Sequence, residues 1–302
     1  MIPDNTTNKC CLCDGTSFKK IPFRYAFKGR FLDGQKCSSC GLISIFPRPS
    51  DDEIEEMYSD DYFTVADKNT HHAKTDYISD IQKVDYTDQI KYIRQFAQTG
   101  NFLEVGCAAG SFLNQLRNNG FNVTGVELST FAAEYGKKNY GIDIINKPFD
   151  DVLLGKELQE NGFDIIMMGD VLEHFTDPAK AMELSCKLLK KGGKLITHVP
   201  GTLNLISSRL AFAWYRLSGK QKTMNIPPYH LTEFFPGTLR KMFLKTGFAS
   251  AEIIQKTKHP RTIPLRHSKI ENFVKLTTQY PNFFITKIFG IYGDRITGIG
   301  TK

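Results

Sequence analysis

The feature that most constrains this chain is a regular alternation of short apolar runs and helix-like segments between Asn101 and Val199. The apolar runs are bounded by turn residues, as expected of buried strands, whereas the segments between them carry apolar residues at helical spacing. We expect strands over 102–106, 123–127, 142–145, 163–168 and 194–199, and helices over 111–118, 130–139 and 178–189. This alternation predicts a doubly wound α/β fold, in which helices cover both faces of a mostly parallel sheet. Ligands of such sheets bind at the carboxyl ends of the strands, where the strand order reverses.

A turn made of small residues follows the first expected strand. The residues from Gly106 to Gly110 allow the backbone to bend tightly and approach a ligand, and the N-terminus of a helix follows at once. A dinucleotide site would need G-x-G-x-x-G, and Ala108 and Ser111 break that pattern. Glu127 ends the second strand, and its two oxygens can accept hydrogen bonds from both hydroxyls of a ribose. The sequence therefore predicts a site for a nucleoside cofactor without pyrophosphate.

Four motifs, in this order, resemble class I S-adenosylmethionine-dependent methyltransferases. They are EVGCAAG at 104–110, GVELS at 125–129, DVLEH at 170–174 and KGGKL at 191–195, each at the end or entrance of an expected strand. The resemblance is strong from Asn101 to Val199 and weak beyond, and it departs from the family at Ala108, where glycine is usual. It implies a Rossmann-like methyltransferase fold with a mostly parallel seven-stranded sheet, S-adenosylmethionine as the methyl donor and methyl transfer as the reaction.

The resemblance also implies which residues contact the cofactor. Glu104 would lie near the methionine moiety, Glu127 would hold the ribose, and Leu128 would pack on the adenine. Asp150 matches the position that contacts the adenine amino group, and Asp170 the position beside the methionine ammonium. The turn residues that would pass beneath the cofactor are Gly106, Ala108 and Gly110.

Two histidines are candidates for the base that takes a proton from the methyl acceptor. His174 follows the fourth strand on the acceptor side of this fold, and His230 lies in a Pro-rich segment that covers the acceptor pocket in relatives. Each histidine also has a purely structural interpretation: His174 could cap or pack against the loop, and His230 could be a structural residue at the entrance of a helix. Glu173 and His174 could also contribute to a divalent-metal site, and His198 could line the same pocket.

The N-terminal cysteines form two C-x-x-C pairs, Cys10 with Cys13 and Cys37 with Cys40. In a chain expected in the cytoplasm, such pairs indicate metal ligands rather than disulfides. Four thiolates are the ligand set of a structural zinc site, in which no coordination position is left open for water or substrate. Cys11 is a rival ligand, and a redox-active or metal-free thiol cluster is the alternative. Apolar residues alternate between the two pairs, which predicts a small antiparallel ribbon.

The expected organisation has three parts. Residues 1–49 form a zinc-ribbon-like module, and 50–100 form linker helices, with a capping box at Ser50 opening an acidic helix through Met57, a polar linker at 64–74 and an amphipathic helix at 76–97. Residues 101–302 form the methyltransferase domain. Its apolar, aromatic insertion around 201–230 is interpreted as a helical lid, with interfacial membrane contact as the rival.

Charge and composition limit the partners. The net charge is +7, and residues 256–302 alone carry nine Lys and Arg against two acids. We interpret these basic residues as a solvated surface, with binding of an anionic substrate, an anionic membrane or nucleic acid as the alternatives. No secretory signal is visible, so we expect a cytoplasmic protein; its oligomeric state is left open.

The cysteine ribbon ahead of this core further resembles methyltransferases of sugar and surface-polysaccharide clusters. We therefore expect O-methylation of a sugar, a surface glycan or another small hydroxylated acceptor. An RNA methyltransferase, and a non-catalytic zinc-ribbon binding module on a degenerate methyltransferase fold, are the alternatives.

Overall fold

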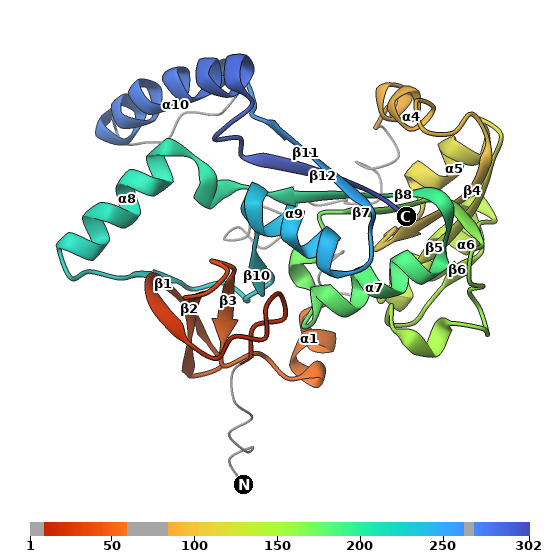
Figure 1. Cartoon of the computed structure of the whole chain (residues 1–302), viewed down its shortest axis with the longest axis horizontal. Coiled ribbons are helices and arrows are strands. Elements are labelled where there is room, and N and C mark those ends of the chain that lie inside the picture. The colour runs from red at the N-terminus through yellow and green to blue at the C-terminus, as the bar shows by residue number, and fades with distance from the viewer. Residues whose placement is uncertain (1–8, 59–83, 263–268) are drawn as a thin grey trace, which may run out of the picture.

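The computed structural model describes residues 9–58, 84–262 and 269–302, and its centre is a seven-stranded sheet (Figure 1). The strand order is β11-β12-β8-β7-β4-β5-β6, and all neighbours are parallel except those of β12, which runs antiparallel to β8 and β11. Chain order reverses between β4 and β7, so their carboxyl ends form the switch point. The strands are β4 (Gly100–Val105), β5 (Phe121–Val126), β6 (Ile144–Ile145), β7 (Phe163–Gly169), β8 (Leu189–Pro200), β11 (Ser250–Lys256) and β12 (Arg295–Thr301).

Helices cover both faces of this sheet, as the alternation predicts. Because successive side chains of a strand point to opposite faces, Leu103 and Val105 pack on one side and Phe102 on the other. The first side is covered by α7 (Pro178–Leu188) and α9 (Pro236–Lys245), and the second by α4 (Thr87–Ile93), α5 (Ser111–Arg117) and α6 (Thr130–Tyr140). The predicted α/β class and Rossmann-like arrangement are confirmed.

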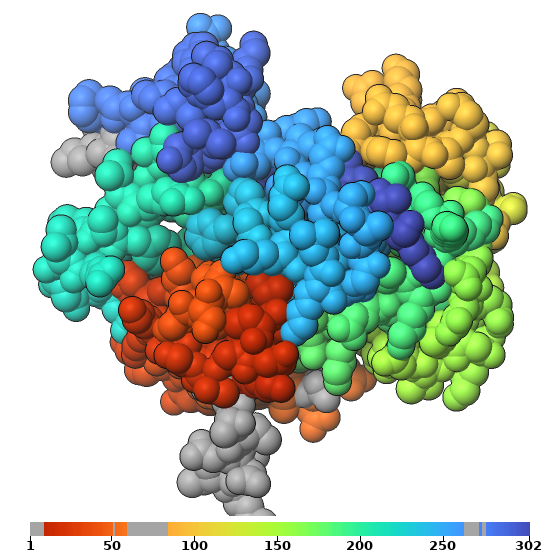
Figure 2. Space-filling view, in the orientation of Figure 1, coloured from red at the N-terminus to blue at the C-terminus, as the bar shows by residue number. Residues whose placement is uncertain are grey.

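A second, five-stranded sheet joins the N-terminal residues to the insertion after β8. Its order is β10-β3-β2-β1-β9, with β1 (Phe18–Phe27), β2 (Arg30–Cys37) and β3 (Ile43–Phe46) from the N-terminus and β9 (Lys222–Met224) and β10 (Thr232–Glu233) from the insertion. The expected antiparallel ribbon is the β1–β2 pair. Figure 2 shows the N-terminal residues packed directly against the later parts of the chain. Cys10, Leu12 and Leu42 belong to the same buried cluster as Leu239 and Met242 of α9.

The remaining elements frame these two sheets. The capping box of Ser50 and Glu53 opens α1 (Asp51–Met57), as predicted. Helices α8 (Ile206–Leu217) and α10 (Lys269–Phe289) lie at one end of the molecule, away from α4, α5 and α6 (Figure 1). The expected linker at 64–74 and the first part of the expected helix at 76–97 lie outside the described residues. Short 3-10 helices complete the chain: η1 (Asp151–Leu153), η2 (Leu172–His174), η3 (Thr202–Asn204) and η4 (Pro260–Thr262). Within the described ranges, none of the helices is long and apolar enough to cross a membrane.

Candidate functional site

The turn after β4 is a tight cradle at the switch point. Gly106 has φ of +70°, and its N–H donates to the carbonyl of Val126 at 2.8 Å. A Cβ at Gly106 would lie 2.4 Å from Cγ2 of Val171, so only glycine fits this position as it stands. Gly110, also at φ +70°, leads directly into α5. Val171 therefore packs directly on the backbone of Gly106, which holds the turn tightly at the carboxyl ends of β4 and β7.

Glu127 fastens this turn to the end of β5. One carboxylate oxygen accepts from the N–H of Ala108 at 2.8 Å, and the other from the N–H of Ser129 at 2.9 Å. Ala108 has φ of +47°, a conformation that an L-residue adopts at a cost. A carboxylate offers about four acceptor sites, so Glu127 keeps capacity for two ribose hydroxyls while it holds the loop.

Glu104 is an acid buried inside the same region. Burial, together with the charge of Glu127, raises its pKa to about 8. Among the described residues, its Oε2 has no hydrogen-bond partner. A buried acceptor without a donor fits a ligand that brings its own donors or positive charge, as the methionine end of S-adenosylmethionine does.

The other predicted cofactor residues lie at the same edge of the sheet and are more exposed. Leu128 is exposed after β5, and Asp150 is exposed too, with one oxygen accepting from the N–H of Val152 at 2.9 Å. Asp170 directly follows β7 at φ +55° and forms an ion pair with Arg295 at the start of β12. The sequence interpretation missed Arg295, since a lone arginine at a strand entrance carries no signal of its own.

Glu173 and His174, which follow Asp170 in η2, form a cluster with His230 in which Glu173 is buried and both histidines are half-buried. Oε1 of Glu173 lies 3.6 Å from Nε2 of His174 and 4.0 Å from Nε2 of His230, and the two rings meet edge to face with centroids 5.1 Å apart. Burial raises the pKa of Glu173 to about 8. The pKa of His230 is also raised, because Glu233 and Glu173 outweigh the opposing effect of burial.

The structure thus brings both predicted base candidates together, and it adds residues that the sequence interpretation left out. The hydroxyl of Tyr58, at the end of α1, lies 2.5 Å from Nδ1 of His174, and Glu233 lies 3.8 Å from Nδ1 of His230. Glu173, His174 and His230 each offer one ligand atom, all within 4.8 Å of one another, so the cluster could also hold a metal ion. His198 instead forms a hydrogen bond with Thr297 on the neighbouring strand β12, with 2.9 Å between its Nδ1 and Oγ1 of Thr297.

The small sheet holds His230 in this cluster. The N–H of Leu231 donates to the carbonyl of Glu173 at 2.9 Å, while the carbonyl of Leu231 accepts from the N–H of Ile45 in β3 at 3.1 Å. Directly after it, β10 pairs with β3 through Thr232 and Ser44. The main sheet supplies Glu173 and His174, and the edge of the small sheet supplies His230.

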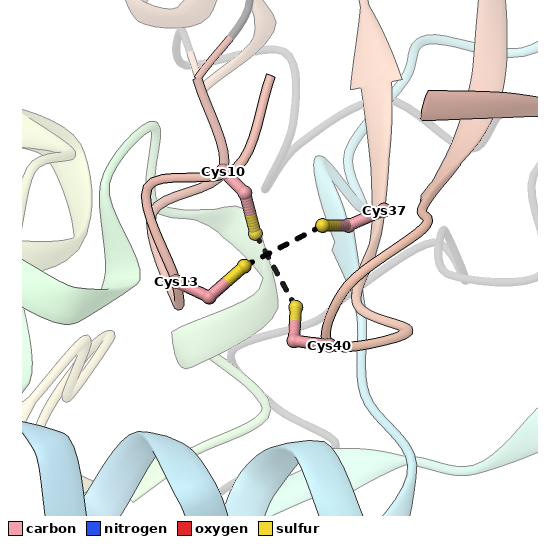
Figure 3. Close-up of side chains that lie close together, drawn as sticks. All are labelled: Cys10, Cys13, Cys37 and Cys40. Atoms are coloured by element: carbon pink, nitrogen blue, oxygen red, sulfur yellow. Dashed lines mark hydrogen bonds between the residues drawn. The ribbon is translucent and has the colours of Figure 1, made fainter. Parts of the chain in front are cut away.

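The four predicted cysteine ligands converge from two loops (Figure 3). Sγ of Cys10 lies 3.5 Å from Sγ of Cys40, Sγ of Cys13 lies 3.5 Å from Sγ of Cys37, and all four lie within 4.8 Å of one another. Tetrahedral zinc–thiolate geometry, with Zn–S of about 2.3 Å, requires sulfurs about 3.8 Å apart. The cluster is therefore compatible with zinc. Cys11 lies outside it, and burial raises the pKa of its thiol to about 11.

Comparisons with known proteins show to which family and fold this chain is similar. A family model described as "Methyltransferase domain" matches residues 77–253. The chain is 29% identical over 145 residues to a ubiquinone biosynthesis O-methyltransferase of Coxiella burnetii, which covers 46% of this chain and 58% of that protein. It is 26% identical over 165 residues to the protein of the same name from Psychrobacter arcticus, covering 53% and 63%.

The match thus spans less than two thirds of the length of these curated relatives. Among solved structures, a SAM-dependent methyltransferase from Archaeoglobus fulgidus superposes with a TM-score of 0.51 at 18% identity, over 73% of this chain and 94% of that one. At this level of identity the likeness concerns the fold alone.

Proposed function

The chain belongs to the class I S-adenosylmethionine-dependent methyltransferases, and from that premise we propose that it transfers the methyl group to a hydroxyl of a small acceptor. The observation that carries the choice of a hydroxyl is the cluster of Glu173 and His174, which follow β7, with His230, which lies just before β10. An alcohol must lose its proton when it is methylated, so a site for such acceptors needs a base. The curated relatives are O-methyltransferases by name, which supports the same choice.

We propose that the cofactor lies over the cradle after β4. Glu127 would hold the ribose, Leu128 would pack on the adenine, and Asp150 would accept from its amino group. Glu104 and Asp170 would face the methionine end, while Gly106, Ala108 and Gly110 would pass beneath it. S-adenosylmethionine supplies an electrophilic methyl group on a sulfonium sulfur.

The chain's own groups would then position the acceptor and take its proton. We propose that the proton passes to an imidazole nitrogen of His230 or His174. Glu233 beside His230, and Glu173 when it is ionised, would stabilise the imidazolium that forms. The raised pKa of His230 supports this role, since its carboxylate neighbours favour the protonated ring. Tyr58 would fix the orientation of His174 through its hydroxyl.

The acceptor class is the most specific part of the proposal. A sugar or surface glycan rests on the sequence resemblance of the N-terminal arrangement, so labelled-methyl transfer should be screened against nucleotide sugars, glycan fragments, phenols and RNA. Transfer to a hydroxyl compound supports the proposal. Transfer only to RNA, or only to an amine, would overturn it.

Variants separate the roles within the cluster. Of the variants His230→Ala, His174→Ala and Glu173→Gln, the one that removes the base should lower kcat by about 10²–10⁴-fold, with cofactor affinity retained. His259→Ala, which changes an exposed histidine just before η4, is the matched control. If metal analysis finds a second metal ion per chain that is lost in His230→Ala and kept in Cys40→Ser, the cluster is a metal site rather than a base.

We further propose that Cys10, Cys13, Cys37 and Cys40 hold a structural zinc ion. Residues 1–49 would then be a zinc module, 50–100 the linker helices, and 101–302 the methyltransferase domain with its insertion at 201–230. One zinc per chain, lost in Cys40→Ser and kept in Cys11→Ser, is the expected metal analysis.

A further inference from the structure

Helices α8 and α10 expose apolar side chains that neither the cofactor site nor the base cluster uses. None of the residues of α8 is buried, and Leu210, Trp214 and Leu217 are 59%, 53% and 88% exposed. Their spacing of four and three residues places them on one face of the helix. An aromatic and aliphatic stripe of this kind is unusual on a surface that meets only water.

Helix α10 carries a second such stripe. Phe273, Phe284 and Ile288 are 69%, 54% and 68% exposed, and helical spacing places them on one side of the helix with Leu276. The start of α8 meets α10, where Oδ1 of Asn282 accepts from the N–H of Ile206 at 3.0 Å. Together the two helices form one end of the molecule (Figure 1).

The charge of the segments that contain these helices is strongly positive. The segments 201–232 and 256–293 contain eleven Lys and Arg and one acid, Glu271, while the rest of the chain carries slightly more acids than bases. Arg216, Lys220 and Lys287 are exposed beside the apolar stripes. The basic residues are Arg209, Arg216, Lys220, Lys222, Lys256, Lys258, Arg261, Arg266, Lys269, Lys275 and Lys287.

We propose that α8 and α10 form a docking surface for an anionic lipid bilayer. Amphipathic helices with Trp, Phe and Leu on one face and Lys and Arg around it bind in the plane of the headgroups, without crossing the membrane. Anionic headgroups complement the excess of positive charge. A second copy of this chain would instead oppose two surfaces of the same sign, and nucleic acid, which stacks on aromatic rings, would leave the aliphatic side chains of Leu210, Leu217 and Ile288 exposed to water.

The single tryptophan of the chain, Trp214, lies in this surface and reports on it directly. We expect its emission to shift to shorter wavelength with phosphatidylcholine vesicles that contain about 30% phosphatidylglycerol, and to be quenched when the lipid tails are brominated. Neither effect is expected with pure phosphatidylcholine, and about 1 M salt, where the Debye length is about 3 Å, should weaken binding at least about tenfold.

Variants test the surface independently of the methyltransferase site. Leu210→Asp with Leu217→Asp should weaken vesicle binding at least about tenfold, whereas Leu244→Asp, which charges an exposed leucine of α9, should not. Circular dichroism and cofactor binding verify that each variant is folded. The proposal is overturned if anionic vesicles leave the emission of Trp214 unchanged, or if light scattering shows that the protein self-associates through this face. It is also overturned if RNA rather than vesicles binds to this face.

Discussion

Replacing Gly106 by alanine tests whether the turn after β4 is a rigid cradle. The left-handed conformation costs an L-residue about 1–2 kcal/mol, partly offset by the lower entropy of the unfolded chain, so the backbone term is about 1 kcal/mol. The new Cβ would also lie 2.4 Å from Cγ2 of Val171, and overpacking of this kind costs about 1–3 kcal/mol. We expect Gly106→Ala to lower the free energy of unfolding by about 2–4 kcal/mol.

Two further variants separate these terms. Gly141, at the end of α6, has φ of +59° and no atom within 4 Å of the position that a Cβ would take, so Gly141→Ala should show the backbone term alone. Val171→Ala removes both Cγ atoms and leaves only its Cβ, 3.4 Å from the new methyl. In that background Gly106→Ala should cost only about 1 kcal/mol, which gives a coupling energy of about 1–3 kcal/mol.

Urea unfolding at constant m value measures each free energy, and calorimetry with S-adenosylmethionine measures the effect on the site. Cofactor affinity should fall in Gly106→Ala and stay unchanged in Gly141→Ala. If Gly106→Ala costs no more than Gly141→Ala, or if the coupling to Val171 is near zero, the turn yields easily and the cradle is not pre-formed.

Three other variants probe the remaining parts of the molecule. Glu104 keeps its proton up to about pH 8 in the folded protein, whereas in the unfolded chain it releases the proton near its ordinary pKa. The free energy of unfolding of the wild type should therefore fall as the pH rises between these two values. Urea unfolding at several pH values should show that Glu104→Gln lacks this part of the fall. Glu127→Ala should weaken cofactor binding by at least about tenfold in calorimetry, because at least one charge-assisted hydrogen bond, typically about 1.5–3 kcal/mol, would be lost. Cys40→Ser should release zinc and lower kcat more than cofactor affinity in steady-state assays, with Cys11→Ser unchanged.

The sequence predicted the elements whose side chains face one continuous core. The residues of β4 and β7 alternate between two buried faces, so their apolar runs are unambiguous, and the expected ranges 102–106 and 163–168 lie close to the observed strands. Strands β9 and β10 escaped prediction because two or three residues are too few to show a period. The sequence predicts no helix over α10, because much of the apolar face of this helix is exposed and lacks the pattern of a core helix.

The residues of the candidate site also fall into a set that the sequence can nominate and a set that it cannot. The residues that we propose to bind the cofactor follow successive strands of one sheet, so topology alone places them at one edge, and sequence motifs suffice to nominate them. The cluster of Glu173, His174 and His230 depends on pairing between β10 and β3, and Tyr58 reaches it from α1. No local pattern encodes contacts between segments so far apart in the chain.

The cysteine cluster is linked through β3 to the cluster of Glu173, His174 and His230, which we propose as the acceptor half of the site. Cys37 ends β2, and its carbonyl accepts from the N–H of Gly41 at 3.0 Å, just before β3 begins at Ile43. β3 in turn holds Leu231 and Thr232, and so fixes His230 against Glu173. A metal at the cysteines would thus stabilise the acceptor half of the site through one strand, while the cradle after β4 and Glu127 depend on the main sheet. Loss of the metal should therefore separate turnover from cofactor binding, which a purely peripheral zinc module would not do.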